Sequence, residues 1–509
     1  MIKRNCTILI KDEVNCAVLG LTDEHVDFLK AKFAILIPQR FHMVKYKLGV
    51  WDGTVSFFDK NGSTYVNLLD EIVPILVGYN YKIDIKDKRI NNILVPDTID
   101  ENYWANRGIT LKGQPLVLRT HQVKVINSLT GTGAGIGLAA TGAGKTFITA
   151  TLTKIYEELD NLRVITIVPN KTLVRQTHKD YAMLGLDAGI LYGDKKELQN
   201  EHLVSTWQSL KNIPHIIKEY DVIIIDEAHQ AKGNVLQKIL TEHGRNIPYR
   251  FGLTGTMPKE EVDVMAIRVS IGETLVSVNA RELIDKNILA NLDIEIYELE
   301  HNFKIEYSKY KRDFVPTLTR PDILPYREFK DGYLPDWTSE KSYNQQKEEH
   351  IDWIAQKLEE AARDHGNVLC LVDGVKHGQR LCDATEGAYF LSGKNSTKER
   401  EDIYRRYATE DNIILYATAQ IASTGLSINR IFVLAYINFG KSGIKVIQSI
   451  GRGLRMDDDK KRVRVLDITN DLKFSRRHTI ERVKFYKEAD YPYTKKKVKF
   501  ADIDDDLFA

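Results

Sequence analysis

The chain has 509 residues, of which 43% are hydrophobic and 28% charged, values typical of globular domains with sizeable cores. A net charge of +2 excludes a simple polycation, so any binding to nucleic acid must come from local basic patches. No apolar run reaches the ~20 residues of a membrane span, no signal peptide is recognisable, and four scattered cysteines favour neither a disulfide framework nor a zinc site; we expect a cytoplasmic protein.

Residues 1–95 predict a small α+β domain. Two strand-like segments precede a helix for which Thr22 is the expected N-cap. The triplet Trp51-Asp-Gly within 46–59 has turn chemistry and predicts a hairpin between two strand-like segments.

From residue 108 onward, short apolar runs alternate with helix-length segments, and the same pattern returns after residue 350. The runs are 136–140, 163–169, 221–226 and 251–256, then 367–372, 388–393, 412–418, 430–437 and 462–468. Continuous apolar runs of this kind indicate buried parallel strands joined by crossover helices, so two α/β domains are predicted. The Tyr-, Lys- and Arg-rich segment 301–350 is either a linker or an ordered insertion that touches a partner. We interpret the basic 493–500 and acidic 501–509 as a solvated tail.

Two glycine-rich phrases, 131–135 and 141–146, compete for the role of a phosphate-binding loop. Such a loop needs a strand before it, a helix N-terminus after it, a Lys for the phosphates and a Ser or Thr for Mg²⁺. Only the second phrase is followed by Lys145, Thr146 and a helical pattern. The first phrase is therefore predicted to be the turn that leads into the strand.

The run 221–230 ends in Asp226-Glu227-Ala228-His229. A carboxylate at the C-terminal end of a strand neighbouring the P-loop strand can hold Mg²⁺, which we predict for Asp226. Glu227 can then orient and deprotonate the attacking water. The alternative is a strand end with solvated acids.

The segment 446–455 places Gln448, Arg452 and Arg455 on one short element of the second α/β block. An arginine delivered to the transferred phosphoryl group can accelerate hydrolysis by ~10³–10⁵. Taken alone, the segment could be an ordinary basic turn. Together with the P-loop it predicts an ATPase site built between two domains.

These residues resemble the superfamily 2 helicases and translocases over roughly 108–470. The resemblance rests on motifs in the family's order: LRTHQ (118–122), AATGAGKT (139–146), VPNKTLVRQ (168–176), STWQSL (205–210), DEAH (226–229), LTGT (253–256), ELIDKNILA (282–290), ATAQIASTGLSI (417–428) and QSIGRGLR (448–455). Segment 282–290 is similar to the RecG- and XPB-related branch. Ser427 departs from the Asp of many relatives, which implies a different coupling between ATP and DNA.

A closer resemblance is to the phage UvsW-type helicases, carried by STGLSI (423–428), HGQRL (377–381) and FHMVKYKLGVWDGTVSFFD (41–59). It implies an ATP- and Mg²⁺-dependent DNA helicase that migrates Holliday junctions, regresses forks and dissociates R-loops, in the host cytoplasm if the chain is viral. We expect a monomer. The open alternatives are a duplex DNA translocase, an RNA helicase without branch specificity, and a non-hydrolysing scaffold.

The resemblance also implies roles for single residues. Catalysis is expected from Lys145, Asp226, Glu227, Gln448, Arg452 and Arg455, and Mg²⁺ binding from Thr146 and Asp226. Nucleotide binding is expected from Gln122, as the adenine reader, and from Thr141, Gly142, Ala143, Gly144, Lys145, Thr146 and Gly425. DNA phosphates are expected at Thr172, Ser205, Thr206, Thr418 and Thr424, although each hydroxyl could instead cap a helix or turn. The N-terminal candidates for branch binding are Arg40, Lys45, Lys47 and Trp51, of which Trp51 could instead be a core residue.

The predicted fold class is α/β, with two RecA-like parallel-sheet motor domains after a small α+β domain. The expected organisation is an N-terminal branch-binding domain, a first motor domain, a linker or insertion, and a second motor domain with a charged tail, at 1–95, 96–300, 301–350 and 351–509.

Overall fold

The structure, a computed structural model, describes residues 4–90, 93–300, 305–307, 316–318, 337–418, 430–438, 440 and 462–500. The chain forms two compact units, Met1–Asn279 and Ala280–Ala509. Six residues singled out above lie outside the described residues: Thr424, Gly425, Ser427, Gln448, Arg452 and Arg455.

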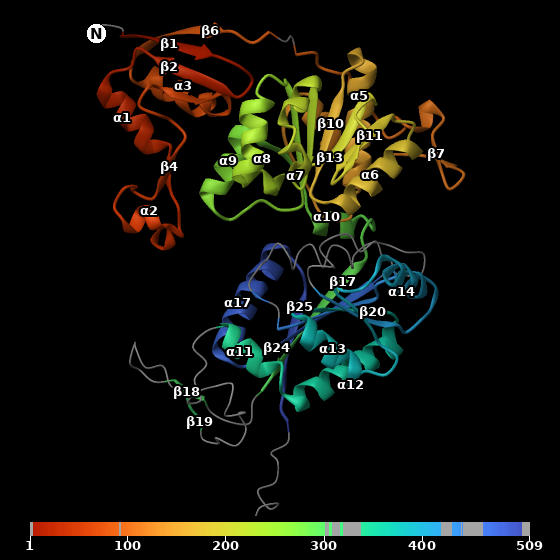
Figure 1. Cartoon of the computed structure of the whole chain (residues 1–509). Helices are drawn as coiled ribbons and strands as arrows, with labels where there is room; N and C mark the ends of the chain where they lie inside the picture. Colours follow the sequence, from red (N-terminus) through yellow and green to blue (C-terminus); the bar gives the residue numbers. More distant parts are fainter. Residues whose placement is uncertain are drawn as a thin grey trace, which may run out of the picture. The chain divides into compact units, whose positions relative to one another are not determined.

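The first unit opens with a four-stranded sheet in the order β5-β2-β1-β6 (Figure 1). Its elements are β1 (Arg4–Ile10), β2 (Asn15–Leu19), α1 (Asp23–Lys32), β5 (Ser63–Tyr65), α3 (Leu69–Gly78) and β6 (Tyr81–Asp87). Strand β1 pairs antiparallel with β2 and parallel with β6. Ile8, Leu29, Phe58 and Leu68 are fully buried in the core of this block, which we call the N-terminal block.

Two local predictions for this block need correction. Thr22 does occupy the N-cap of α1, but its hydroxyl contacts His25 Nδ1 at 3.0 Å and caps no backbone N–H. The expected Trp51-Asp-Gly hairpin is absent from the described N-terminal block. Strand β4 (Thr54–Ser56) pairs with the distant β3 (Ala34–Leu36), and the residues before the turn form the short helix α2 (Val44–Lys47). The apolar residues that suggested a strand are exposed to solvent instead of alternating across a sheet.

The N-terminal block is joined tightly to the α/β block that follows it. Val269 of α9 (Glu261–Ile271) is fully buried in the core of the N-terminal block. The Arg268 guanidinium contacts the carboxylates of Asp70 at 2.8 Å and Glu71 at 2.5 Å, both on α3. These contacts make the two blocks parts of one unit.

The α/β block of the first unit holds an eight-stranded sheet in the order β12-β11-β13-β10-β14-β15-β9-β16. The strands are β9 (Ala134–Ala139), β10 (Val164–Val168), β11 (Ala188–Tyr192), β12 (Lys195–Lys196), β13 (His202–Thr206), β14 (Val222–Asp226), β15 (Tyr249–Thr254) and β16 (Thr274–Val278). All pair in parallel except β12. One expectation is corrected: β14 does not neighbour the P-loop strand β9, because β15 lies between them.

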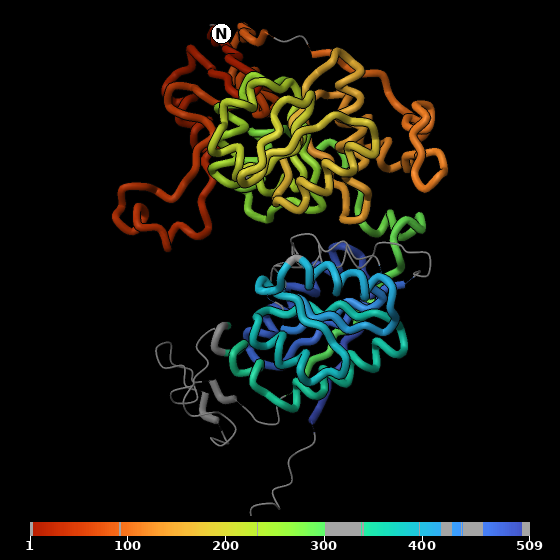
Figure 2. The backbone as a smooth tube through the Cα atoms, turned by 45° about the vertical axis from the view of Figure 1, so that its right-hand side comes forward, coloured from red at the N-terminus to blue at the C-terminus, as the bar shows by residue number. Residues whose placement is uncertain are grey.

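Helices cover both faces of this sheet, with α5 and α6 on one side and α8 and α9 on the other (Figure 1; Figure 2 gives the chain path). The remaining elements here are α4 (Thr120–Thr130), α5 (Lys145–Asp160), α6 (Lys171–Met183), α7 (Trp207–Leu210), α8 (Asn234–Lys238) and the short hairpin β7 (Thr110–Leu111) with β8 (Gln114–Pro115). Strands β10 and β13 are buried along their whole length, which agrees with the mostly apolar sequence of β10, whereas β13 also buries polar side chains. Within the described ranges, no helix combines the length and apolar character needed to cross a bilayer.

The second unit contains a seven-stranded parallel sheet in the order β21-β22-β20-β23-β24-β17-β25. The strands are β17 (Asn291–Leu299), β20 (Val368–Val372), β21 (Tyr389–Leu391), β22 (Ile414–Thr418), β23 (Val433–Ile437), β24 (Arg462–Asn470) and β25 (Tyr493–Val498). The helices are α10 (Ala280–Asp285), α11 (Trp337–Asn344), α12 (Glu348–His365), α13 (Val375–Asp383), α14 (Thr397–Thr409) and α17 (Lys473–Glu488); β18 (Ile305–Tyr307) pairs with β19 (Pro316–Leu318). Two α/β units with parallel sheets confirm the predicted fold class.

Two boundaries differ from the expected ones. Strand β17 falls within the range expected for the first motor domain, yet it pairs with β24 and β25, so the chain divides after Asn279 rather than at 300. The basic run at 493–498 is an edge strand, not a tail. Its lysines form ion pairs with acids of β17 and of the residue that follows it: Lys495 with Glu298, Lys496 with Glu295 and Lys497 with Glu300.

The end of the segment 301–350 is folded. The carboxylate of Glu340 on α11 is fully buried and accepts hydrogen bonds from the backbone N–H groups of Phe474 at 2.8 Å and Ser475 at 2.7 Å. These N–H groups belong to the first turn of α17, whose own N-cap residue is Leu472 and has no side chain able to accept them. Helix α11 is therefore an integral part of the second unit, which corrects the linker interpretation for these residues.

Candidate functional site

The second glycine phrase has the geometry of a phosphate-binding loop. Strand β9 ends at Ala139 and the 16-residue helix α5 begins at Lys145, so residues 140–144 form the connecting loop. Gly142 and Gly144 have φ of 89° and 80°, in the left-handed region that favours glycine. The N-terminal N–H groups and dipole of α5 favour an anion at this loop. The first phrase is the turn between α4 and β9, as predicted.

Gln122 and His121 of α4 hold this loop from behind. The Gln122 amide Nε2 donates to the carbonyl of Ala143 at 3.1 Å, and His121 Nε2 lies 2.9 Å from the same carbonyl. The Gln122 Oε1 accepts from Arg119 N at 2.9 Å, which caps α4. A Cβ on Gly144 would lie 2.3 Å from Gln122 Nε2, so with a φ of 80° any larger residue would strain the backbone and displace the Gln122 amide. The adenine contact expected of Gln122 stays a prediction, since its amide is engaged within the chain. His121 was missed, although it stands in the same LRTHQ motif.

The predicted catalytic residues of the first unit lie together. Lys145 Nζ is 3.0 Å from Glu227 Oε1, although 82 residues separate them in the chain. Asp226 ends β14 and accepts the N–H of Glu227 at 3.0 Å. Glu227 has φ of 59°, a left-handed conformation that is uncommon for a residue with a side chain and is often found at functional sites.

The two neighbouring carboxylates have opposite pKa shifts. Burial and the nearby Glu227 raise the pKa of Asp226 to about 6, with Lys145 acting against them. Burial acts to raise the pKa of Glu227 too, but the positive charge of Lys145 and the contact with His229 lower it to about 2. Glu227 is therefore the charged partner of Lys145, whereas burial makes the ionised form of Asp226 costly unless another cation approaches.

His229 connects this site to the next strand. Its Nδ1 lies 3.0 Å from the hydroxyl of Thr254, at the end of β15, and 3.3 Å from Glu227 Oε2. Thr254 in turn donates to the carbonyl of Thr256 at 3.0 Å. His229 and Thr254 were absent from the predicted site residues. Their signal was present, because both stand inside the DEAH and LTGT motifs.

The hydroxyls expected to contact DNA phosphates differ in exposure. Thr172 is exposed on the first turn of α6, and Thr418 is half-buried at the end of β22. Ser205 and Thr206 need correction, because only 0% and 3% of their surfaces are exposed. Ser205 donates to the carbonyl of Leu191, and Thr206 accepts the N–H of Ser209 as the N-cap of α7. In this structure neither hydroxyl can reach a phosphate.

The N-terminal candidates also differ from one another. Lys45 and Lys47 are exposed on α2. Arg40 is half-buried with its guanidinium 4.3 Å from the ring centroid of Phe41. Trp51 is half-buried and its indole N–H donates to the carbonyl of Thr54 at 2.8 Å.

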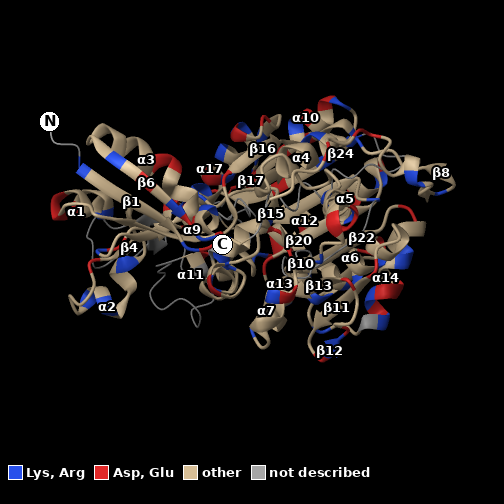
Figure 3. Ribbon diagram, turned by 90° about the horizontal axis from the view of Figure 1, so that it is seen from above, with Lys and Arg blue, Asp and Glu red and all other residues tan. Residues whose placement is uncertain are grey.

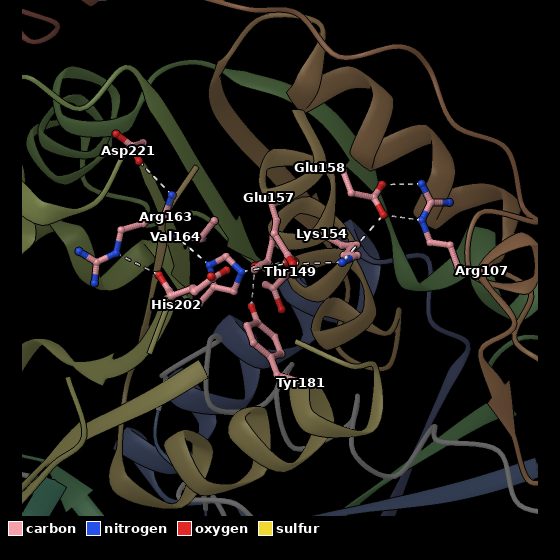
Figure 4. Close-up of polar contacts among 12 residues, drawn as sticks. Arg107, Thr149, Lys154, Glu157, Glu158, Arg163, Val164, Tyr181, His202 and Asp221 are labelled. Carbon is pink, nitrogen blue, oxygen red and sulfur yellow. Dashed lines mark hydrogen bonds and ion pairs between the residues drawn. The ribbon is translucent and has the colours of Figure 1, made fainter. Parts of the chain in front are cut away.

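Glu157, Glu201 and His202 place one ligand atom each within 4.8 Å of the others, which is close enough for a metal ion. Figure 4 shows why His202 does not fit that role: its Nδ1 accepts the N–H of Val164 at 3.2 Å. The ring proton must then sit on Nε2, which faces Glu157 Oε2 at 3.5 Å and has no lone pair for a metal. The cluster links α5 to two buried strands and serves the fold.

Comparison with known proteins places the site in a family. The family described as "Type III restriction enzyme, res subunit" matches residues 115–259, which contain the P-loop and the DEAH motif. With this loop and motif in a parallel sheet, and a second parallel α/β unit, the chain is a superfamily 2 helicase, an ATP-dependent enzyme.

The chain is homologous to the ATP-dependent DNA helicase uvsW of Enterobacteria phage T4. The two are 23% identical over 486 residues, which cover 89% of this chain and 92% of that one. Putative helicase 22 of a Sulfolobus islandicus filamentous virus is 24% identical over 377 residues, 69% of this chain and 64% of that one. The solved structure of the restriction-modification enzyme LlaBIII bound to DNA shares the fold, with a TM-score of 0.56 at 12% identity over 87% of this chain and 36% of that one.

Proposed function

We propose that this helicase uses ATP to remodel branched DNA: it migrates Holliday junctions, regresses forks and dissociates R-loops during recombination, repair and replication. The observation that carries the proposal is the similarity to a DNA helicase along 89% of this chain and 92% of that helicase. In branch migration, base pairs lost on one arm re-form on another, so the net cost is near zero although each step is worth ~1.4 kcal/mol of stacking. A motor combined with a branch-holding domain would suffice, and we expect it to act as a monomer.

The donor set at the P-loop fits a magnesium ion. Mg²⁺ prefers hard oxygen ligands, and the Thr146 hydroxyl and the Asp226 carboxylate are of that kind. The raised pKa of Asp226 supports this role, because a buried carboxylate with an incomplete set of cationic neighbours gains most from a metal ion. Mg²⁺ would supply charge neutralisation to the ATP phosphates. Thr146 and Asp226 would hold it in place.

The contact between Lys145 and Glu227 suggests how ATP binding readies the site. The phosphates of ATP would compete with Glu227 for the Lys145 ammonium, which lies 3.0 Å from the Glu227 carboxylate. Once Lys145 turns to the phosphates, the influence that lowers the pKa of Glu227 weakens. Glu227 then becomes a better base for the attacking water, so ATP itself would activate the residue that promotes its hydrolysis.

We propose that Gln448, Arg452 and Arg455 complete the reaction by stabilising the charge on the transferred phosphoryl group. Gly425 would contact the nucleotide from the same unit. The Arg452→Ala variant tests this role: ATP turnover should fall by ~10³ with little change in ATP affinity. A variant that keeps the wild-type turnover would remove Arg452 from the mechanism.

We propose that DNA is bound through its phosphates, independently of sequence, with Thr172, Thr418 and Thr424 among the contacts. Thr172 is exposed at the start of α6 and Thr418 is half-buried at the end of β22, positions from which a hydroxyl can contact a phosphate. Each phosphate that a cationic side chain neutralises should add ~0.7–0.9 to the slope of log affinity against log salt.

A duplex DNA translocase without branch preference is the second candidate. It is favoured by the match to a restriction-enzyme family and by the fold shared with LlaBIII. An RNA helicase is the third. ATPase rates measured with a four-way junction, a fork, a linear duplex and an RNA–DNA hybrid separate them. Branch remodelling predicts higher ATPase rates on the junction and the fork. Equal rates on all four substrates would favour the duplex translocase instead. A higher rate on the RNA–DNA hybrid would favour the RNA helicase.

A further inference from the structure

The segment 37–53 between β3 and β4, which we call the β3–β4 excursion, extends away from the sheet of the N-terminal block. Helix α2 lies at its far end in Figures 1 and 3. Its two-stranded stem is closed by the N–H of Ile37, which donates to the carbonyl of Gly53 at 2.9 Å. Phe33 and Phe57 flank the stem and are buried in the core of the N-terminal block. The excursion is therefore anchored firmly at its base.

Contacts within the excursion give it a defined shape. The Trp51 indole N–H donates to the carbonyl of Thr54 at 2.8 Å. The Arg40 guanidinium lies 4.3 Å from the ring centroid of Phe41, and a Cβ on Gly53 would lie 2.3 Å from Arg40 Cδ. Arg40 and Trp51 were both predicted to contact DNA, but both are half-buried and make contacts that stabilise the excursion itself.

Its outer surface carries large apolar side chains in water. Val44, Leu48 and Val50 are 68%, 72% and 75% exposed. A cluster of exposed apolar side chains on a built protrusion marks an interaction site. The same surface is basic: Lys45 and Lys47 are exposed on α2, and the ribbon around α2 carries blue in Figure 3. The acid of the excursion, Asp52, is occupied by the N–H and hydroxyl of Thr54 at 2.9 and 2.7 Å.

We propose that the tip of this excursion, Leu48 and Val50, packs against the last base pair at a DNA branch point, while Lys45 and Lys47 bind the flanking phosphates. This inference rests on the proposed branch-remodelling function and names the element that meets the branch. Only at a branch or an end does a base pair present an open apolar face, and aliphatic side chains are known to wedge against such faces. A second copy of this chain fits the surface less well, because two basic surfaces repel each other.

The test uses the full-length protein and a four-way junction with 2-aminopurine either at the branch or inside one arm. Two variants remove one feature each: Leu48→Ser with Val50→Ser removes the apolar tip, and Lys45→Gln with Lys47→Gln removes the charges. Val77→Ser is the matched control, because Val77 is 58% exposed on α3 of the same block. Leu48→Met with Val50→Ile keeps the apolar tip and should keep activity.

Wild-type protein should change the fluorescence of the branch probe and leave the arm probe unchanged. The serine variant should lose that change and process junctions about tenfold more slowly, with a smaller loss on linear duplex, while the control and the Met/Ile variant match the wild type. The Gln variant should weaken junction binding and lower its salt dependence by up to ~2 in slope. If the serine variant is as active on junctions as the wild type, this inference is overturned but the proposed function stands. The proposed function is defeated by a different result, namely a wild-type protein with no preference for branched DNA. Wild-type self-association that the serine substitutions abolish would assign the tip to a second copy and equally overturn this inference.

Discussion

Lys145 Nζ lies 3.0 Å from Glu227 Oε1, which pairs the residue expected to bind ATP phosphates with the residue expected to activate water. The pair joins the first turn of α5 to the residue that follows β14. Helix α5 follows strand β9, and β15 lies between β9 and β14 in the sheet. The contact satisfies both charges, and we expect the phosphates of ATP to compete with Glu227 for the Lys145 ammonium.

The Lys145→Ala variant should lose ATP hydrolysis by ~10² or more, because the loop then lacks the cation that the transition state requires. Steady-state phosphate release measures this loss. Lys154→Ala, on the same helix, is the matched control: Lys154 pairs with Glu157 at 3.2 Å and is expected to leave hydrolysis unchanged. Equal losses in the two variants would mean that helix α5 is damaged in general and that Lys145 has no special role.

Asp226 should make the stability of the folded protein fall as the pH rises. Its pKa is about 6 in the folded protein and about 3.9 in an unfolded chain, so between these values the folded state binds more protons. The stabilising contribution is complete below pH ~4 and is lost as pH rises through about 6. Asp226→Asn, which mimics the protonated form, should therefore be more stable than the wild type at pH 7, by up to about 3 kcal/mol, and similar to it near pH 4.

Thermal unfolding without Mg²⁺ or nucleotide at the two pH values measures the difference. Glu227→Gln is the opposite control, because the pKa of Glu227 is lowered to about 2 and its ionised form stabilises the fold above pH ~4.5. That variant should be less stable than the wild type at pH 7. If both variants are more stable than the wild type at pH 7, or both are less stable, the assignment of opposite pKa shifts to Asp226 and Glu227 is wrong.

Glu340→Ala should destabilise the second unit by about 2–4 kcal/mol, because two backbone N–H groups and the Ser475 hydroxyl lose a buried charged acceptor. Glu349, exposed in the first turn of α12, provides the control Glu349→Ala, which should cost less than about 0.5 kcal/mol. Hydrogen exchange of α17 resolves the effect. Protection that is unchanged in Glu340→Ala would show that α11 does not support that helix.

Arg268→Met should loosen the attachment of the N-terminal block, since Arg268 contacts Asp70 and Glu71 across the boundary. We expect a loss of about 1–3 kcal/mol and faster hydrogen exchange in α3. Arg245→Met is the control, because Arg245 is mostly exposed and lies 3.7 Å from Asp12 across the same boundary. Slow exchange of α3 in both variants would contradict the role given to Arg268.

Much of this architecture was predictable because the parallel strands are buried on both faces and so leave unbroken apolar runs such as 221–226. The P-loop was predictable for a related reason: its glycines and Lys145 are required locally, by the loop itself. Strand β25 was missed because its basic residues look solvated, and only the acids near β17, some 200 residues away in the chain, make it a strand.

Long-range packing also explains the other failures. Ser205 and Thr206 match a family position, yet both are buried: Ser205 donates to the carbonyl of Leu191 on the neighbouring strand, and Thr206 caps α7 through the nearby N–H of Ser209. The exposed apolar residues around Leu48 imitate a strand, because exposure cannot be read from residue type alone. The motifs identified the class of enzyme, whereas the contacts between distant segments decide which of their side chains remain available.

The most direct test of the account measures how fast the full-length protein converts a mobile four-way junction into duplex products with saturating ATP and Mg²⁺, beside its unwinding of a linear duplex of equal length. We predict that the junction is processed at least about tenfold faster and that Lys145→Ala processes neither substrate. Equal rates on junction and duplex, or conversion of the junction by Lys145→Ala, would contradict the claim that ATP hydrolysis in this chain drives the remodelling of branched DNA.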